Sequence, residues 1–147
     1  MIIRSKKFII RPHRKSDIAS LIENINNKKI IKNLTAVPYP YTKKDALIFI
    51  NHNLKNNKLK TKVEHSFAIE INGSLVGGIG VNNISGHKGA IGYWLSEDYW
   101  GEGITTSAVK LITSYAFQKV KLQRLTAYVF AYNKASARVL EKAGFKY

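Results

Sequence analysis

The first half of the chain alternates between short apolar runs and segments whose apolar residues recur at helical spacing. The run 8–12 predicts a strand that ends at its proline, because proline cannot continue a hydrogen-bonded ladder. Ser16 is interpreted as the N-cap of a first helix. The apolar residues of that helix share one face: Ile18, Ala19, Leu21, Ile22 and Ile25. The proline-rich segment 37–41 predicts a loop, after which Thr42 caps a second helix.

A hairpin opens the second half of the chain. Strand-like runs at 67–71 and 75–81 flank the dipeptide Asn72-Gly73. This dipeptide favours the left-handed backbone that a two-residue hairpin turn requires. After a turn near Gly86, a third strand is expected at 90–95, so the three strands form an antiparallel meander.

Behind the meander, the pattern predicts a helix, a strand and a helix. A long helix begins after Gly101–Gly103, and a strand at 124–130 follows it. Asn133 then caps the last helix, which ends at Lys142 before Gly144. The order is therefore β-α-α-β-β-β-α-β-α. It implies an α/β fold with a mixed, mostly antiparallel central sheet and helices on both faces. No repeat or linker divides residues 1–147, so we expect a single domain.

Composition excludes several classes of protein. The 147 residues include no cysteine, which rules out a disulfide scaffold, a thiolate metal site and a cysteine nucleophile. No apolar run approaches the roughly 20 residues that a bilayer span needs, and the N-terminus lacks a signal-peptide pattern. We therefore expect a soluble, cytoplasmic protein without membrane association.

The net charge of +15 is the one extreme figure in the composition. A strongly basic protein attracts anions, which here means a phosphorylated small molecule, an acidic peptide or nucleic acid. The 19 lysines are dispersed, however, and no block of like charges resembles a nucleic-acid-binding tail. An overall bias toward lysine, asparagine and isoleucine explains the charge equally well.

The turn before the long helix is the first candidate for chemistry. The segment Trp-Gly-Glu-Gly-Ile at 100–104 joins a strand to a helix start. There the first backbone N–H groups lack intrahelical partners and carry the positive end of the helix dipole. Glycines at 101 and 103 let an anion approach those amides, and Thr105 and Thr106 add hydroxyl donors. The turn is suited to a pyrophosphate, although two glycines in a tight turn can also be purely structural.

Together with a second segment, this turn resembles the GNAT acetyltransferase superfamily. The run Asn-x-x-Ser-x-Arg-Val-Leu-Glu-Lys-x-Gly-Phe at 133–145 is similar to the late helix of that family. Pro38–Thr42 followed by Asp45-Ala46 is similar to the branch of ribosomal-protein N-terminal acetyltransferases. The three motifs occur in the family's order and extend over almost the whole chain.

The resemblance implies an N-acetyltransferase that uses acetyl-CoA as cosubstrate and no metal. Amides of Gly101, Gly103, Ile104, Thr105 and Thr106 would bind the pyrophosphate. Main-chain groups of Tyr93, Trp94 and Leu95 would pair with the pantetheine arm, and one of those amides could stabilise the oxyanion. Asn133 would hold the pantetheine or assist the acceptor amine, and Ser136 would protonate the departing thiolate.

Departures from the family pattern leave alternatives open. Many relatives carry a tyrosine acid at the position of Leu140 and a glutamate at the position of Ala90. The general base is therefore unassigned, and Glu70 is a candidate only by elimination. The acceptor, a protein N-terminus or a small amine, would be bound by the loop Asn33–Tyr41 and the second helix. The alternative is a catalytically inactive acyl-CoA-binding module, or an RNA- or ribosome-associated module of the same fold.

The end of the chain suggests one more expectation. Members of the superfamily continue past the Gly-Phe motif with two further strands, whereas this sequence ends at Tyr147. Strand 124–130 would then be an open sheet edge. Unpaired edges favour pairing with another chain, so we expect either association into a homodimer through this edge or an incomplete sequence. A true 147-residue product should be a poor enzyme, because the missing strands would cover part of the acceptor side of the site.

Overall fold

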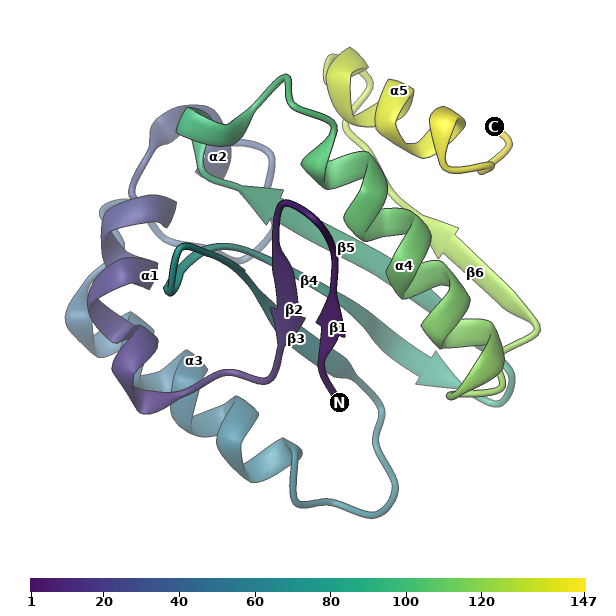
Figure 1. Cartoon of the computed structure of the whole chain (residues 1–147), viewed down its shortest axis with the longest axis horizontal. Coiled ribbons are helices and arrows are strands. Elements are labelled where there is room, and N and C mark those ends of the chain that lie inside the picture. Colours follow the sequence, from purple (N-terminus) through teal and green to yellow (C-terminus); the bar gives the residue numbers. More distant parts are fainter.

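The computed structural model describes all 147 residues and contains one six-stranded sheet (Figure 1). The strands are β1 (Ile3–Arg4), β2 (Ile9–Arg11), β3 (His65–Ile71), β4 (Ser74–Ser85), β5 (Lys88–Leu95) and β6 (Arg124–Ala127). They lie in the sheet in sequence order, antiparallel except for the parallel pair of β5 and β6. The predicted mixed, mostly antiparallel sheet is confirmed.

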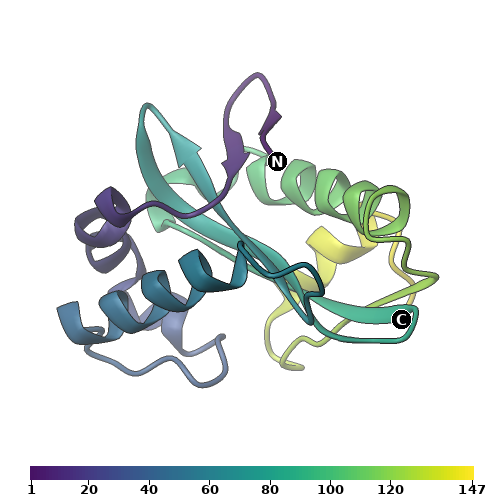
Figure 2. The ribbon, with the colours of Figure 1, turned by 90° about the horizontal axis from the view of Figure 1, so that it is seen from below.

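Helices cover both faces of the sheet, as the element order predicted. They are α1 (Ile18–Ile25), α2 (Lys28–Ile31), α3 (Lys43–Asn56), α4 (Ile104–Gln118) and α5 (Lys134–Lys142). Figure 2 shows α1 and α3 on one side of the sheet and α4 and α5 on the other. None of these helices combines the length and the apolar character that crossing a bilayer would demand.

Three helix-end predictions are confirmed by side-chain geometry. The Thr42 hydroxyl accepts the N–H of Asp45 at 3.2 Å, and the Asp45 carboxylate accepts the N–H of Thr42 at 2.8 Å, which completes a capping box. The Asn133 carboxamide oxygen accepts the N–H of Ser136 at 3.2 Å and caps α5. Gly144 has a positive φ of 99° after the end of that helix.

Some boundaries differ from the sequence prediction. Strand β1 and helix α2 were not predicted, because two and four residues are too short to show a periodic pattern. Ser16 is not a helix cap, because it lies inside a 3₁₀ turn that precedes α1. The carboxylate of Asp17 closes that turn by accepting the N–H of Arg14 at 2.7 Å.

The predicted strand 124–130 is also shorter than expected. Strand β6 ends at Ala127, and the following residues leave the sheet. One contact explains their direction, because the Tyr132 hydroxyl donates to the carbonyl oxygen of Lys32 at 2.9 Å. The segment is thereby held toward α2 and away from β5. Strand β6 has β5 as its only strand neighbour and forms one edge of the sheet.

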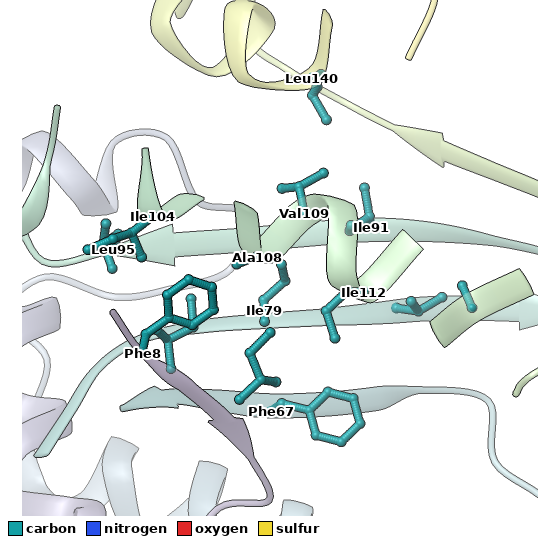
Figure 3. Packing of buried hydrophobic residues seen from close by; sticks show 14 of the residues in the cluster. Phe8, Phe67, Ile79, Ile91, Leu95, Ile104, Ala108, Val109, Ile112 and Leu140 are labelled. Atoms are coloured by element: carbon teal, nitrogen blue, oxygen red, sulfur yellow. The ribbon is translucent and has the colours of Figure 1, made fainter. Parts of the chain in front are cut away.

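The larger hydrophobic core lies between the sheet and α4. Figure 3 shows Phe67, Ile79 and Ile91 of three neighbouring strands packed beneath the side chains of α4. Ile104, the first residue of α4, is 2% exposed and belongs to the same cluster as Leu95 at the end of β5. Burying side chains of this size stabilises the fold by about 1.5–3 kcal/mol each. The core therefore fixes where α4 begins relative to β5.

A buried ion cluster joins the N-terminal segment to the sheet. The guanidinium of Arg11, 2% exposed, donates two hydrogen bonds to Asp17, at 2.7 and 2.9 Å, and one to Glu70 at 2.7 Å. Burial alone would raise the pKa of Asp17. The hydrogen bonds from Arg11 and from the N–H of Arg14 outweigh burial and lower that pKa below its usual value.

His13 lies beside this cluster and provides a test of the fold. It is 4% exposed, its ring lies edge-on to Phe49, and burial lowers its pKa to about 4. A depressed histidine pKa means that the unfolded chain binds a proton at a pH where the folded chain does not. The contribution of His13 to the free energy of unfolding is therefore fully present above pH ~6.5, and it decreases as the pH falls toward the pKa of the folded state.

We expect the free energy of unfolding to fall by about 2 kcal/mol between pH 7 and pH 5 because of His13. The His13→Gln variant should lack most of this decrease, whereas His87→Gln, a change on an exposed turn, should retain it. Urea denaturation at the two pH values measures the difference. Equal decreases in the wild type and the His13 variant would contradict the assignment.

Candidate active site

A cleft of about 1140 Å³ opens where β5 and β6 separate. The two strands pair from Lys88 and Arg124 as far as Ile91 and Ala127, but β5 continues to Leu95. Residues of β5, the turn before α4, the segment after β6, helix α5 and helix α2 line the cleft. The site is thus built at the point where a parallel pair ends while one of its strands goes on.

The structure brings every residue predicted to contact acetyl-CoA or to protonate its thiolate into this one cleft. They come from three separate parts of the chain: β5, the turn with the start of α4, and the start of α5. The lining includes Tyr93, Trp94, Leu95, Gly101, Gly103, Ile104, Thr105, Thr106, Asn133 and Ser136.

The turn before α4 presents open backbone to the cleft. Gly101 and Gly103 have positive φ values of 80° and 77°, a region that disfavours residues with a Cβ. A Cβ at either position would meet no protein atom within 4 Å, so the space over the turn is free for a ligand. The first backbone bond of the helix runs from the N–H of Ser107 to the carbonyl of Gly103 at 3.1 Å. The amides before Ser107 therefore have no intrahelical acceptor, and a bound anion would satisfy them.

Strand β5 offers the second open surface. Residues 92–95 pair with β4 on one side but have no β6 partner on the other. Trp94 points to the face opposite α4 and lies over Gly78, where an added Cβ would come within 2.7 Å of the indole nitrogen. The Trp100 indole donates to the Leu95 carbonyl at 2.8 Å, which ties the turn to the end of the strand. An extended ligand could add to the free side of β5 as a further strand.

Helix α5 supplies the third part of the cleft, and here the structure reveals a contact that the sequence analysis missed. The Tyr93 hydroxyl lies 2.6 Å from the Ser136 hydroxyl and also donates to the Ser136 carbonyl at 3.3 Å. Burial raises the pKa of Tyr93, and its hydrogen bond with Ser136 opposes that shift only in part. The alternation of side chains along β5 could have placed Tyr93 on this side of the sheet, because Ile91, Tyr93 and Leu95 share the face that α4 covers.

The cleft contains cations but no carboxylate or imidazole. Its charged lining residues are Lys29, Lys32 and Lys142. Glu70, the candidate base named by elimination, is bound to Arg11 and does not line the cleft. Glu97 lies outside the lining as well, where it accepts from Lys29 at 2.7 Å. The lining therefore offers no evident general base.

The acceptor side differs in part from the sequence prediction. Of the loop Asn33–Tyr41, only residues 33–35 line the cleft, and α3 contributes nothing. Helix α2, which was not predicted, takes its place. The Asn33 side-chain oxygen is buried without a hydrogen-bond partner, while its nitrogen donates to the carbonyl of Lys29 at 3.3 Å.

Comparison with known proteins identifies the family of the chain. The family model for the acetyltransferase (GNAT) domain matches residues 7–146. The chain belongs to the GNAT acetyltransferase family. Among its GNAT relatives is YjcK of Bacillus subtilis, an N-acetyltransferase by name, which is 53% identical over 55 residues, 37% of this chain and 30% of that protein.

One further relative and one solved structure of the same fold carry names that refer to ribosomes. YdaF of Bacillus subtilis, whose name describes a ribosomal N-acetyltransferase, is 36% identical over 75 residues, 50% of this chain and 41% of that protein. The structure of RimL, a ribosomal L7/L12 α-N-protein acetyltransferase in complex with coenzyme A, superposes with a TM-score of 0.86 at 22% identity. It covers 99% of this chain, and the chain covers 84% of it. The matches to YjcK and YdaF span less than half the length of those proteins.

Proposed function

We propose that this GNAT protein transfers the acetyl group of acetyl-CoA to a primary amine by direct attack within a ternary complex. One observation carries the proposal. An open anion-binding turn, an unpaired strand side and a hydroxyl-bearing helix meet in a single cleft, although they come from separate stretches of sequence. Each part suits one portion of acetyl-CoA, namely its pyrophosphate, its extended pantetheine arm and its thioester.

The turn and the surrounding charge would bind the phosphates. Free amides at the start of α4, with the Thr105 and Thr106 hydroxyls, would donate to the pyrophosphate oxygens. Lys142 and the overall charge of +15 would raise the local concentration of an anionic cosubstrate. The absence of a Cβ at Gly101 and Gly103 lets the phosphates approach the main chain.

Strand β5 and helix α5 would act on the thioester. Backbone groups at 93–95 would pair with the pantetheine amides, and an N–H there would stabilise the oxyanion formed when the amine attacks. Ser136 would then protonate the thiolate, while Asn133 would orient the acyl-bearing arm. The amine nitrogen loses one proton as the amide forms, and the sulfur gains one, so no covalent enzyme intermediate is needed.

The lining favours an α-amino group as the acceptor over a polyamine. A polyamine carries several positive charges, and the cleft lining has no carboxylate to receive them. Of its three lysines, Lys29 is paired with Glu97, while Lys32 and Lys142 remain as free cations. Without a general base, the acceptor must arrive neutral. That condition suits an α-amine, with a pKa near 8, better than an aliphatic amine near 10. The names of YdaF and RimL support the same class, a protein N-terminus, with the ribosome as a source of acceptors.

A second candidate function follows from Leu140 and Ala90. Both are buried, at 6% and 7% exposure, and neither can take part in proton transfer. A chain that binds acyl-CoA or RNA without catalysis would show this pattern. Release of free CoA in the presence of an acceptor separates the two functions.

The deciding experiment is an acceptor panel that follows CoA release. It should contain a peptide with a free N-terminus, the same peptide with a blocked N-terminus and a free lysine, and spermidine. We expect turnover with the first peptide and little with the other two acceptors. Acetyl-CoA binding without turnover on any of them would favour the inactive module, and a salt-sensitive complex with RNA alone would favour the nucleic-acid role.

The phosphate assignment predicts the effect of a Cβ at the turn. Gly103→Ala should weaken acetyl-CoA binding about tenfold or more and should abolish most of the rise in Tm that the ligand produces. Gly73→Ala is a matched control, because that hairpin glycine has φ of 82°, equally open surroundings and no place in the cleft. Both variants carry a similar backbone cost of about 1–2 kcal/mol. Equal ligand-induced shifts in the two would overturn the assignment.

The thiolate assignment predicts a separation between rate and binding. Ser136→Ala should lower kcat by about 10²–10⁴ with little change in affinity for acetyl-CoA. Asn133→Ala should reduce both, because it also removes a helix cap that contributes about 1 kcal/mol. Steady-state kinetics and calorimetry on the two variants measure the difference. A Ser136→Ala protein with the wild-type kcat would exclude the hydroxyl as the proton donor.

A further inference from the structure

Tyr93 and Ser136 form the shortest side-chain contact within the cleft. Their hydroxyl oxygens lie 2.6 Å apart, although the residues are 43 positions apart in the chain. The phenol oxygen also lies 3.3 Å from the Ser136 carbonyl, a longer contact that leaves the single Tyr93 proton able to be donated to the Ser136 hydroxyl. Both residues line the cleft, so Ser136 can touch a bound ligand while Tyr93 supports it from the strand.

An aliphatic hydroxyl alone is a poor acid for a thiolate. A thiol has a pKa near 8.5, and a phenol near 10 is close to it, whereas a serine hydroxyl is a much weaker acid than either. Giving up a proton would leave Ser136 as a strongly basic alkoxide in a partly buried position. A second donor that replaces the proton in the same step removes this difficulty.

We propose that Tyr93 is the proton source for Ser136 in the reaction assigned above. As the C–S bond breaks, the proton of the Ser136 hydroxyl moves to the thiolate and the proton of the Tyr93 hydroxyl moves to Ser136. The acceptor nitrogen releases one proton to water in the cleft on forming the amide, and the tyrosinate takes up one proton from that water through the Ser136 hydroxyl, its only side-chain partner. Atoms and charge balance, and no further reactant is needed. The Tyr93 phenol acts through Ser136, so this side chain positions Ser136 and supplies its proton without touching the thioester, while the Tyr93 main chain faces the pantetheine arm.

The residues around Tyr93 and Ser136 suit this pair of proton transfers, which we call the relay. Leu140 lies one turn after Ser136 on the same helix and carries no acidic group. The other titratable side chains that line the cleft are Tyr99 and Tyr128 together with Lys29, Lys32 and Lys142. No carboxylate or imidazole among them competes for the proton of Tyr93. A phenol with an ordinary pKa near 10 carries its proton at neutral pH, and burial raises the pKa of Tyr93 further.

The first test removes the phenol oxygen. Tyr93→Phe should lower kcat by about 10-fold to 100-fold with unchanged acetyl-CoA affinity, and the double variant with Ser136→Ala should be no slower than Ser136→Ala alone. Tyr115→Phe is a matched control, because its half-buried hydroxyl bonds to His65 at 3.1 Å outside the cleft. Independent, multiplicative losses in the double variant would overturn the relay, and so would a Tyr93→Phe protein with full kcat.

A second measurement distinguishes proton transfer from a structural role. In mixtures of light and heavy water, a relay gives a curved dependence of kcat on deuterium content, and Tyr93→Phe should make it linear. Where that variant folds poorly, 3,5-difluorotyrosine at position 93 keeps the ring and hydroxyl but is more acidic. It should move the falling limb of the kcat–pH profile to lower pH. An unmoved limb would overturn the proposal, whereas a wild-type chain that releases no CoA with any amine would overturn the assigned reaction as well.

Discussion

The separation of β5 from β6 is the constraint on which the rest of the site depends. If the parallel pair continued to Leu95, side chains and backbone of β6 would fill the space that the cleft occupies. Two anchors keep the strands apart. The first is the contact of Leu95 with the core that also contains Ile104, which fixes the end of β5 against α4. The second is the hydrogen bond from the Tyr132 hydroxyl to the Lys32 carbonyl, which spans the opening of the cleft. The cleft is therefore a consequence of packing at its edges.

The same separation explains why the proposed ligand contacts in the cleft are largely main-chain N–H and C=O groups. A strand that loses its neighbour exposes a row of N–H and C=O groups, and a helix that starts on glycine exposes its first amides. Both surfaces are fixed by hydrogen bonds and core contacts made elsewhere, so they need no reorganisation to receive an extended, anionic ligand. In the proposed acetyl transfer, side chains are then required only where a proton moves. This economy is consistent with a site that has no cysteine, histidine or carboxylate.

Much of this arrangement could be predicted from sequence, because its parts are local. The capping box at Thr42, the hairpin turn, the glycine turn before α4 and the cap at Asn133 each depend on residues within a few positions of one another. The short elements β1 and α2 escaped prediction because their stability comes from packing. The end of β6 escaped because the contact between Tyr132 and Lys32 joins residues 100 positions apart. Glu70 could not be excluded as a base until its partner Arg11, 59 positions away, was known.

The contact between Tyr93 and Ser136 depends on the register of β5, and the sheet fixes that register through shape. Alternate residues of a strand point to opposite faces, so a slip of one residue would bring Trp94 toward α5 and send Tyr93 to the α1 face. Gly78 opposes this slip, because it leaves room for the Trp94 indole only on the face where it now lies. On the other face, Ile91 and Leu95 are buried at 5% exposure each and would have to leave the core. The hydroxyl pair is therefore positioned by apolar packing on both sides of the sheet, so residues without polar groups determine where the proposed proton transfer would take place.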